Sequence, residues 1–297
     1  MNGRERGFLL LTSSLGDPAR HPLTAPQLRM LTRRMRDMKQ PDEERELTSA
    51  DLTALGYSCQ MAQRILRLLG GGAVLDYYLQ KGQKAGCVPV TRVSGGYPIL
   101  LRKRLGEESP GCLWAKGDLS LLEKPGIALV GNRELQPENR AFAREVGRQA
   151  ARQGFVLISG NARGADREAQ DACLDAGGYV VSVVADELEK WQPRQRQLYL
   201  SEDGFDLPFS AQRAISRNRV IHALGWRTLV AQVGEPSGGT WDGSVKNLRF
   251  GWSPLFCFDD GSAGMRMLMD MGADSVSMEM LKDFGSLEQN IRTFFDQ

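Results

Sequence analysis

Residues 126–184, GIALVGNRELQPENRAFAREVGRQAARQGFVLISGNARGADREAQDACLDAGGYVVSVV, alternate short aliphatic runs with longer amphipathic segments. This pattern predicts three strands and two helices. The strands are expected at 127–130, 155–159 and 179–184, and the helices at 138–153 and 165–176. Pro137 precedes the first helix and two glycines follow the second, as expected for helix ends. Such alternation indicates a mostly parallel sheet with helices on both faces.

The same alternation continues toward the C-terminus. Helices are expected near 215–224, 242–250 and 263–271, and strands near 228–233, 254–258 and 275–277. The helix at 263–271 is rich in methionine, which suits either core packing or a surface for self-association. The predicted fold class is therefore α/β, and its ligands are expected where the strands end.

The first part of the chain has a different pattern. Residues 1–86 carry apolar side chains at three- and four-residue spacing and predict a small all-helical domain, either a helix-hairpin-helix unit or an ordinary bundle. Residues 87–125 are rich in Pro and Gly and are interpreted as a lead-in segment to the α/β domain, which spans 87–297. The arginines at 29, 33, 34 and 36 are interpreted as a solvated helix face, with a DNA contact as the alternative.

Composition and net charge exclude several classes of function for this chain. The 297 residues carry a net charge of +2, so only local clustering of arginines could form a nucleic-acid site. Five cysteines without a C-x-x-C pair, and no leader peptide, predict a reduced, cytoplasmic protein. Only two histidines are present, which excludes multi-histidine metal sites. No apolar run is long enough to span a membrane. We therefore expect a protein that does not span a membrane and that binds neither a metal nor a cofactor.

Two turns that follow strands have the composition of phosphate-binding loops. The first strand runs into Gly131, Asn132 and Arg133, and a helix N-terminus follows. The second strand runs into a glycine-flanked loop whose backbone amides can surround an anion. Its candidate residues are Ser159, Gly160, Arg163 and Gly164. Glycines here also serve tight turns, but adjacent strand ends converge on one surface, so we interpret the two loops as one binding site.

Two further segments extend this groove. Arg217, Asn218 and Arg219 precede an apolar helix, and a glycine-rich turn follows the next strand with Gly238, Gly239 and Thr240. No histidine, cysteine or carboxylate pair accompanies these donors, so the composition favours binding over catalysis. A G-x-G-x-x-G fingerprint and a P-loop are both missing, which argues against a nicotinamide cofactor.

In this order, the motifs resemble those of the DNA-processing protein A (DprA/Smf) family. The family's G-S-R or G-T-R is matched at 131–133, its S-G-x-A-R-G-x-D at 159–166 and its R-N-R-I-I-x-x-L at 217–224. Segments 95–105 and 113–122 are similar to two further family segments, so the resemblance covers about residues 85–277. It implies an extended Rossmann-like core, here without the C-terminal winged-helix domain of many members, and a SAM-like N-terminal part.

The resemblance also implies a function. It predicts a non-catalytic homodimer that binds single-stranded DNA, protects it and loads RecA in recombination or natural transformation. Ala214 and Ile215 stand where the family has an aromatic residue and a proline, which removes a side chain able to stack on a base. Asp259 and Asp260 replace a Pro-Gly pair and are expected to add negative charge near the groove.

Five aromatic residues are candidates to replace the missing stacking side chain. Trp241 is the preferred one, and the others are expected to pack in the core or in loops. They are Phe205, Phe209, Trp226 and Trp252.

Two other functions use the same fold. One is nucleotide hydrolysis as in LOG-type phosphoribohydrolases, whose P-G-G-x-G-T-x-x-E loop is similar to PSGGTWDG at 236–243 but has a glutamate that this chain lacks. Asp242 and Glu235 are the nearby carboxylates. The other is a nucleotide-sensing role in which the loops bind a small phosphorylated ligand. Both alternatives predict a site for a single nucleotide, whereas DNA binding predicts an extended basic track several nucleotides long.

Overall fold

The computed structural model describes residues 1–37, 46–202 and 204–287. Its centre is a nine-stranded sheet in the order β1-β2-β6-β5-β4-β3-β7-β8-β9. All neighbours pair in parallel except β1 with β2 and β2 with β6, which are antiparallel. The strands are β1 Val88–Thr91, β2 Cys112–Gly117, β3 Gly126–Val130, β4 Val156–Ser159, β5 Tyr179–Val184, β6 Gln197–Glu202, β7 Arg227–Val230, β8 Leu255–Phe258 and β9 Asp274–Val276.

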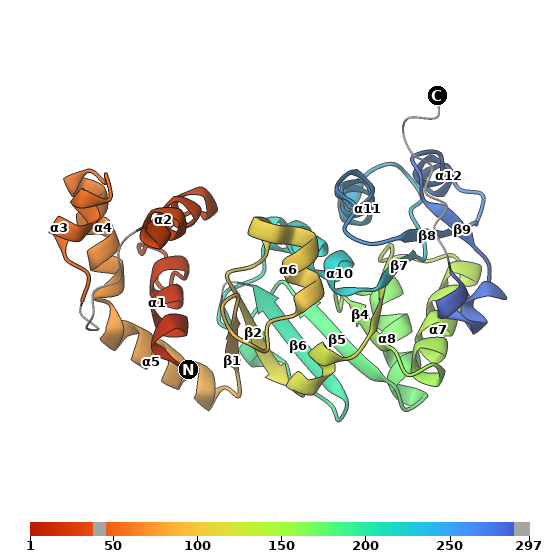
Figure 1. Ribbon diagram of the computed structural model, residues 1–297. Helices are drawn as coiled ribbons and strands as arrows, with labels where there is room; N and C mark the ends of the chain where they lie inside the picture. The colour runs from red at the N-terminus through yellow and green to blue at the C-terminus, as the bar shows by residue number, and fades with distance from the viewer. Residues whose placement is uncertain (38–45, 203, 288–297) are drawn as a thin grey trace.

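Helices cover both faces of this sheet (Figure 1). One face carries α7 Pro137–Arg152 and α8 Ala165–Asp175, which bury a cluster that includes Phe142 and Leu157. The other face carries α6 Ile99–Leu105, α9 Ala211–Ser216, α10 Asn218–Leu224, α11 Gly238–Phe250 and α12 Ala263–Asp270. The short 3-10 helices are η1 Gly106–Glu108, η2 Leu119–Glu123, η3 Leu188–Lys190, η4 Met280–Lys282 and η5 Phe284–Ser286.

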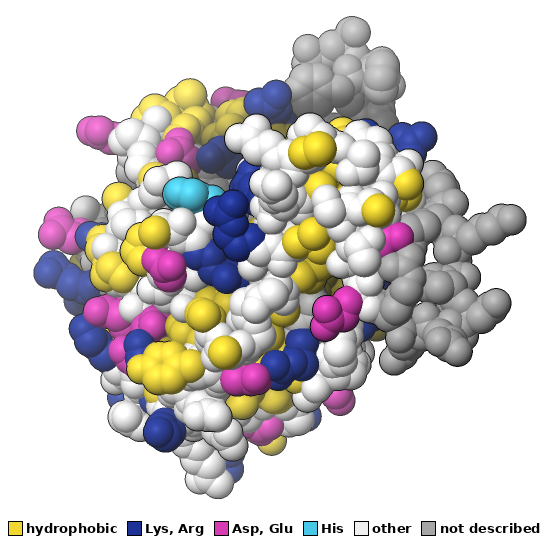
Figure 2. Space-filling model, turned by 90° about the vertical axis from the view of Figure 1, so that its left-hand side faces the viewer, with side chains coloured by type: hydrophobic (Ala, Val, Ile, Leu, Met, Phe, Trp, Pro, Cys, Tyr) yellow, Lys and Arg dark blue, Asp and Glu magenta, His cyan; other side chains and the backbone are white. Residues whose placement is uncertain are grey.

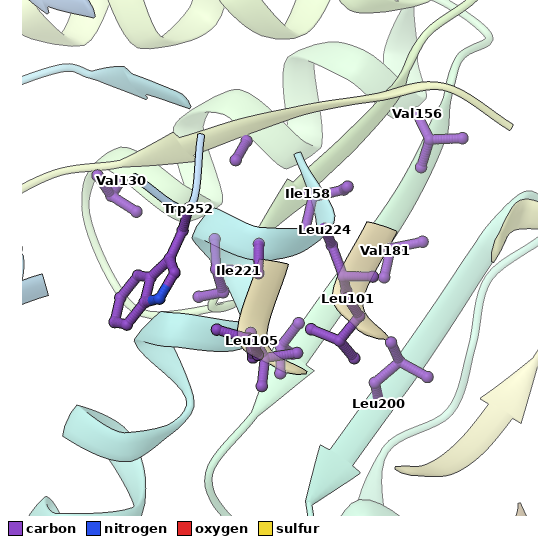
Figure 3. Packing of buried hydrophobic residues seen from close by; sticks show 14 of the residues in the cluster. Leu101, Leu105, Val130, Val156, Ile158, Val181, Leu200, Ile221, Leu224 and Trp252 are labelled. Atoms are coloured by element: carbon purple, nitrogen blue, oxygen red, sulfur yellow. The ribbon is translucent and has the colours of Figure 1, made fainter. Parts of the chain in front are cut away.

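The core on this second face fixes the helix that leads into the site. Leu101 and Leu105 of α6 meet Ile221 and Leu224 of α10 above the strands (Figure 3). These side chains are at most 7% exposed, and burying each large aliphatic side chain stabilises the fold by about 1.5–3 kcal/mol. α10 is therefore held rigidly against the sheet, and with it the residue just before its first turn.

The N-terminal helices form two layers. They are α1 Gly3–Thr12, α2 Ala25–Asp37, α3 Ser49–Ala54, α4 Cys59–Leu69 and α5 Gly72–Lys84. A separate cluster joins α2, α3 and α4 through residues such as Leu52 and Ile65. In contrast, α1 and α5 share their cluster with the sheet, where Tyr78 contacts Trp114 and Phe205 at ring-centroid distances of 5.3 and 4.7 Å. The boundary at residue 86 remains a prediction, because the core is continuous across it.

The structure confirms the predicted fold class and corrects part of its extent. Strands β3, β4, β5, β7, β8 and β9 and helices α7, α8 and α12 occur within a few residues of their expected positions. The single helix expected at 215–224 is instead two helices, α9 and α10, that meet at Arg217, and α11 begins at Gly238 rather than near residue 242. The lead-in segment at 87–125 is more ordered than expected, because β1 and β2 extend the sheet and α6 packs on it. Strand β6 was not anticipated from the sequence.

Two expectations from composition, on membrane-spanning segments and on the cysteines, concern the chain as a whole. None of the helices in the described ranges is both long and apolar enough to cross a bilayer. All five cysteines lie in the described part of the chain as thiols outside disulfides, with Cys59 exposed and the other four buried. Of the methionines in α12, Met265 is buried, while Met267 is 43% exposed.

Candidate functional site

The candidate site lies where the order of the parallel strands reverses. From β3 the chain proceeds outward through β4, β5 and β6, and then returns to place β7 on the other side of β3. At such a switch point the loops that follow neighbouring strands diverge and leave a crevice at their carboxyl ends. The loops after β3, β4 and β5 and the turn before α11 all line cavities at this edge.

Two adjoining cavities of about 390 and 380 Å³ form this groove. The first lies against the loops after β4 and β5, and the second against the loop after β3 and the start of α11. Five residues line both cavities, so the two spaces are continuous. These shared residues are Arg133, Ala162, Phe209, Ala214 and Arg217.

Arg217 lies between the two cavities, at the junction of α9 and α10. It is only 9% exposed, and its Nε has no hydrogen-bond partner in the described structure. The guanidinium lies directly on Gly160, where a Cβ atom would come within 1.4 Å of Nη1. Burial lowers the pKa of Arg217 from its ordinary value, although the charge of Asp166 opposes this shift. A buried N–H group of a guanidinium without a hydrogen-bond acceptor is costly unless an anionic ligand satisfies it.

Asp166 lines the second cavity and organises the loop after β4. Its Oδ2 accepts hydrogen bonds from the backbone N–H groups of Gly160 and Ala162, both at 3.0 Å. Burial raises the pKa of this carboxyl, while the Arg217 charge and the two amides act in the opposite direction. Asp166 therefore holds the loop through local hydrogen bonds.

The rim of the groove carries exposed cations and an aromatic ring. Arg133 is exposed, and the side chain of Arg163 is 79% exposed, with Glu134 at 3.5 Å as a similarly exposed partner. An ion pair this open to solvent contributes little, so Arg163 is available to a phosphate. Phe209 is 57% exposed between the two cavities.

The predicted glycine-rich turn forms the first turn of α11 and lines the second cavity. Two hydrogen bonds hold this turn in place. The Thr240 hydroxyl donates to the Gly131 carbonyl at 3.0 Å, and Asn218 Nδ2 donates to the Gly239 carbonyl at 2.9 Å. Thr240 and Asn218 therefore connect the loops around the groove, while Asn132 and Gly238 contribute to its lining.

The structure does not bring every candidate residue to the groove. Ser159 is fully buried at the end of β4, and its Oγ accepts a hydrogen bond from Gln170. Gly164 lies beneath the loop after β3, where a Cβ atom would be 2.4 Å from the Asn132 and Arg133 carbonyls. Arg219 lines neither cavity and instead forms an ion pair with Glu202 of β6 at 2.8 Å.

Two expectations about nearby side chains are wrong. Trp241, the preferred stacking residue, packs against the core and lines neither cavity, whereas Phe209 does line them. Neither Asp259 nor Asp260 lines the two cavities, and the Oδ2 of Asp260 instead accepts a hydrogen bond from Asn139 of α7 at 2.7 Å. Phe209 follows a strand that the sequence pattern did not reveal, and only its apolar character in a polar loop indicated a role.

The arginines of α2 lie on a different surface. Figure 2 shows the face formed by the N-terminal helices, with Lys and Arg side chains gathered across its middle. Arg29 pairs with Glu107, and the Arg34 guanidinium lies 4.4 Å from the centre of the Tyr57 ring. Arg29 and Glu107 are both about half exposed, which agrees with the interpretation of a solvated helix face.

The fold and the site together define an extended Rossmann-like α/β protein with a basic groove at its strand ends. The chain belongs to the DNA recombination-mediator protein A family, whose family model matches residues 89–284. It is 26% identical over 217 residues to the DNA processing protein DprA of Bacillus subtilis, covering 68% of this chain and 71% of that protein. It is 30% identical over 140 residues to Protein Smf of Escherichia coli, covering 43% of this chain and 37% of that protein.

Two solved structures share the fold. DprA from Streptococcus pneumoniae superposes with a TM-score of 0.72 at 24% identity, covering 95% of this chain and 98% of that one. DNA processing protein A from Helicobacter pylori, whose structure concerns a single-stranded DNA binding mode, superposes with a TM-score of 0.55 at 22% identity. That match covers 65% of this chain and 92% of the other.

Proposed function

We propose that this protein binds single-stranded DNA without catalysis and delivers the strand to the RecA recombinase, acting as a homodimer in the cytoplasm. The observation that carries the proposal is Arg217, a buried guanidinium whose Nε has no hydrogen-bond partner in the described structure, between two cavities with Arg133 and Arg163 at the rim. Three such cations would neutralise backbone phosphates regardless of sequence. The Helicobacter pylori relative and its single-stranded DNA binding mode support the same class of ligand.

The exposed Phe209 supports a single-stranded over a double-stranded ligand. Its ring is 57% exposed beside the buried cation. Unpaired bases gain about 1–3 kcal/mol each by stacking on an aromatic side chain, whereas paired bases are stacked on one another already. Phe209 thus takes the part that the family's aromatic residue before R-N-R was expected to play.

The acidic residues at the groove support binding over hydrolysis. Glu134, Asp186 and Asp166 are the carboxylates lining the two cavities. Two of them already accept hydrogen bonds from groups of the protein, Asp166 from backbone amides and Asp186 from the Trp191 indole N–H at 2.9 Å. A nucleotide-sensing or hydrolysing protein remains the second candidate, favoured by cavities whose volumes lie in the range of small-molecule sites.

Fluorescence anisotropy with labelled oligo-dT across a salt series tests the proposal. We expect tight binding that increases with strand length, prefers single strands and weakens steeply as salt rises. Arg163→Ala and Arg133→Ala should each lower the affinity severalfold and reduce the salt slope by about one unit. Arg152→Ala is the matched control, because Arg152 is 64% exposed at the far end of α7.

Two results would contradict the proposal. Unchanged binding in both groove variants would show that the strand binds elsewhere on the protein. Saturation by a mononucleotide, with no dependence on strand length, would favour the nucleotide-sensing or hydrolysing alternative. If the strand binds as expected, delivery to RecA is tested next. The measurement is the rate at which RecA filaments form on the strand, with and without the protein.

A further inference from the structure

The α11 wall of the second cavity offers donors of a different kind from the rest of the groove. Its N-cap residue Ser237 makes no side-chain hydrogen bond to the first turn. The amides of Gly238, Gly239 and Thr240 therefore lack the partners that a capping side chain would supply. All four residues line the cavity. This helix spans 13 residues, and the positive end of its dipole points into the same space.

Arg217 is a second and independent indication of a ligand in that cavity. Its side chain lines the cavity while being 9% exposed, and its Nε lacks a partner in the described part of the chain. The charges of Asp166 and Asp186 act on this guanidinium through space, but their oxygens accept hydrogen bonds from two backbone amides and an indole N–H, and Nε itself has no acceptor in the described structure. Uncapped amides and a guanidinium Nε without an acceptor around one space call for a ligand with several anionic oxygens.

Among the residues that the structure describes, no Lys or Arg belongs to the lining of the second cavity on its α11 side. Ile221 and His222 line the inner side of the second cavity, and the imidazole of His222 is buried and neutral. Glu235 and Asp242 are exposed on either side of the Ser237–Thr240 turn. A strand that continued past this turn would bring its next phosphate toward two carboxylates, which is electrostatically unfavourable. The cavity therefore suits a phosphate at the end of a chain.

A terminal phosphate also matches the number of donors. A phosphate monoester carries about −1.5 to −2 charges and three acceptor oxygens at neutral pH. A phosphodiester within a strand carries one charge, and two of its four oxygens are used in ester bonds. The first cavity, of about 390 Å³ with Phe209 and Trp191 in its lining, leaves room for the attached nucleoside.

We propose that the second cavity is a phosphate-monoester site, and that the groove takes a nucleoside with a terminal phosphate. That nucleoside is either the end of a DNA strand, in which case the inference rests on the proposed function, or a free mononucleotide. Arg217 and the first-turn amides of α11 hold the phosphate, and Phe209 stacks on the base. The end of a strand is thereby distinguished from its interior.

Three oligo-dT strands with an internal fluorophore test this proposal by anisotropy. One carries a 5′-phosphate, one a 3′-phosphate, and the third has no terminal phosphate but is two nucleotides longer, so that all three carry about the same charge. We expect at least one end-phosphorylated strand to bind about tenfold more tightly than the longer strand, the effect of one added charge-assisted hydrogen bond. Competition by dTMP, with thymidine as control, distinguishes a free nucleotide from a strand end.

The outcomes of this experiment separate the phosphate-monoester proposal from the DNA-binding proposal. Equal binding of all three strands overturns the monoester site and leaves the DNA-binding proposal intact. Displacement of the strand by dTMP at concentrations near the dissociation constant of the strand itself identifies a free nucleotide as the occupant. If no strand binds but dTMP does, the monoester site holds and the DNA-binding function fails. If neither binds, both proposals fail.

Variants of the exposed carboxylates beside the first turn of α11 test the proposal without changing the groups that donate hydrogen bonds to the phosphate. Asp242→Lys and Glu235→Lys would let a strand continue past α11, so the preference for a terminal phosphate should fall about threefold. Asp175→Lys, an exposed carboxylate at the end of α8, is the matched control and should leave the preference unchanged. A preference that survives both groove variants unchanged would show that these carboxylates do not define the end of the track.

Discussion

Gly160 positions the central cation of the groove, because only a residue without a side chain leaves room for it. A Cβ atom at this position would overlap the guanidinium of Arg217, and its φ does not lie in the left-handed region. Gly160→Ala should therefore displace Arg217 without straining the backbone and should lower strand affinity about tenfold. Gly95→Ala, at a glycine with nothing within 4 Å, is the control. Binding by the two variants can be compared by anisotropy, and equal affinities would contradict the assigned role of Arg217.

His222 makes the stability of the protein dependent on pH. It is fully enclosed and both ring nitrogens lack partners in the described structure, so burial lowers its pKa from 6.5 to about 3. Above pH 6.5 the imidazole is neutral in both folded and unfolded chains. As the pH falls below 6.5 only the unfolded chain takes up the proton, so the free energy of unfolding decreases.

The change expected from His222 alone is about 1 kcal/mol between pH 6.5 and 5.5. Urea unfolding of the wild type and of His222→Leu at both pH values isolates this contribution, because the carboxylates titrate in both proteins. The wild type should lose about 1 kcal/mol more than the variant. The same loss in the two proteins would mean that His222 becomes protonated in the folded state.

At the residue scale, the sequence was informative where a motif coincided with a strand end. Arg133, Arg163 and Arg217 follow or adjoin predicted elements and do meet at one groove. Arg219 was assigned to the same groove because it lies two positions from Arg217. Its partner Glu202 belongs to a strand that the sequence pattern did not reveal, so the ion pair that turns Arg219 away could not be anticipated.

At the scale of elements, the groove depends on how closely two strand-end loops approach. Gly164 has φ +92°, and a Cβ atom there would press on the Asn132 and Arg133 carbonyls of the other loop. Gly164→Ala should lower the free energy of unfolding by more than the roughly 1–3 kcal/mol of backbone strain, and should also weaken strand binding. Gly154→Ala is matched, since Gly154 has φ +74° and nothing within 4 Å.

The two glycine variants separate backbone strain from the approach of the loops. Chemical unfolding and anisotropy on both proteins should show a similar strain penalty in each, with the additional loss of stability and the loss of binding confined to Gly164→Ala. If Gly154→Ala weakened strand binding equally, the contact between the two loops would not be what shapes the groove.

The elements themselves were predictable to different degrees for a physical reason. The parallel strands β3, β4 and β5 are buried on both faces, so they read as continuous aliphatic runs between amphipathic helices. Strand β6, QLYLSE, is bounded by polar loops, and β1 and β2 lie among prolines and glycines. Their pairing is decided by contacts with distant strands, and such contacts leave no local pattern in the sequence.

At the scale of the whole molecule, the N-terminal helices are part of the core that supports the sheet. Tyr78 of α5 donates a hydrogen bond to Asp206 at 2.7 Å and packs on Trp114 and Phe205. At Gly82, a Cβ atom would come within 2.7 Å of the Trp114 ring, so the helix lies directly on β2. These contacts join α5 to strands on the far side of the predicted domain boundary.

Removing residues 1–86 should therefore destabilise the remaining α/β part. The fragment 87–297 would expose Trp114 and Phe205, which are both fully buried in the whole chain. Each large-to-small change in such a cluster costs about 2–5 kcal/mol, and the truncation removes several partners together. Thermal unfolding of the fragment should occur well below that of the full chain. A fragment with an unchanged melting temperature would instead establish residue 86 as the boundary of two independently stable domains, since its exposed cluster would then have contributed nothing to the sheet.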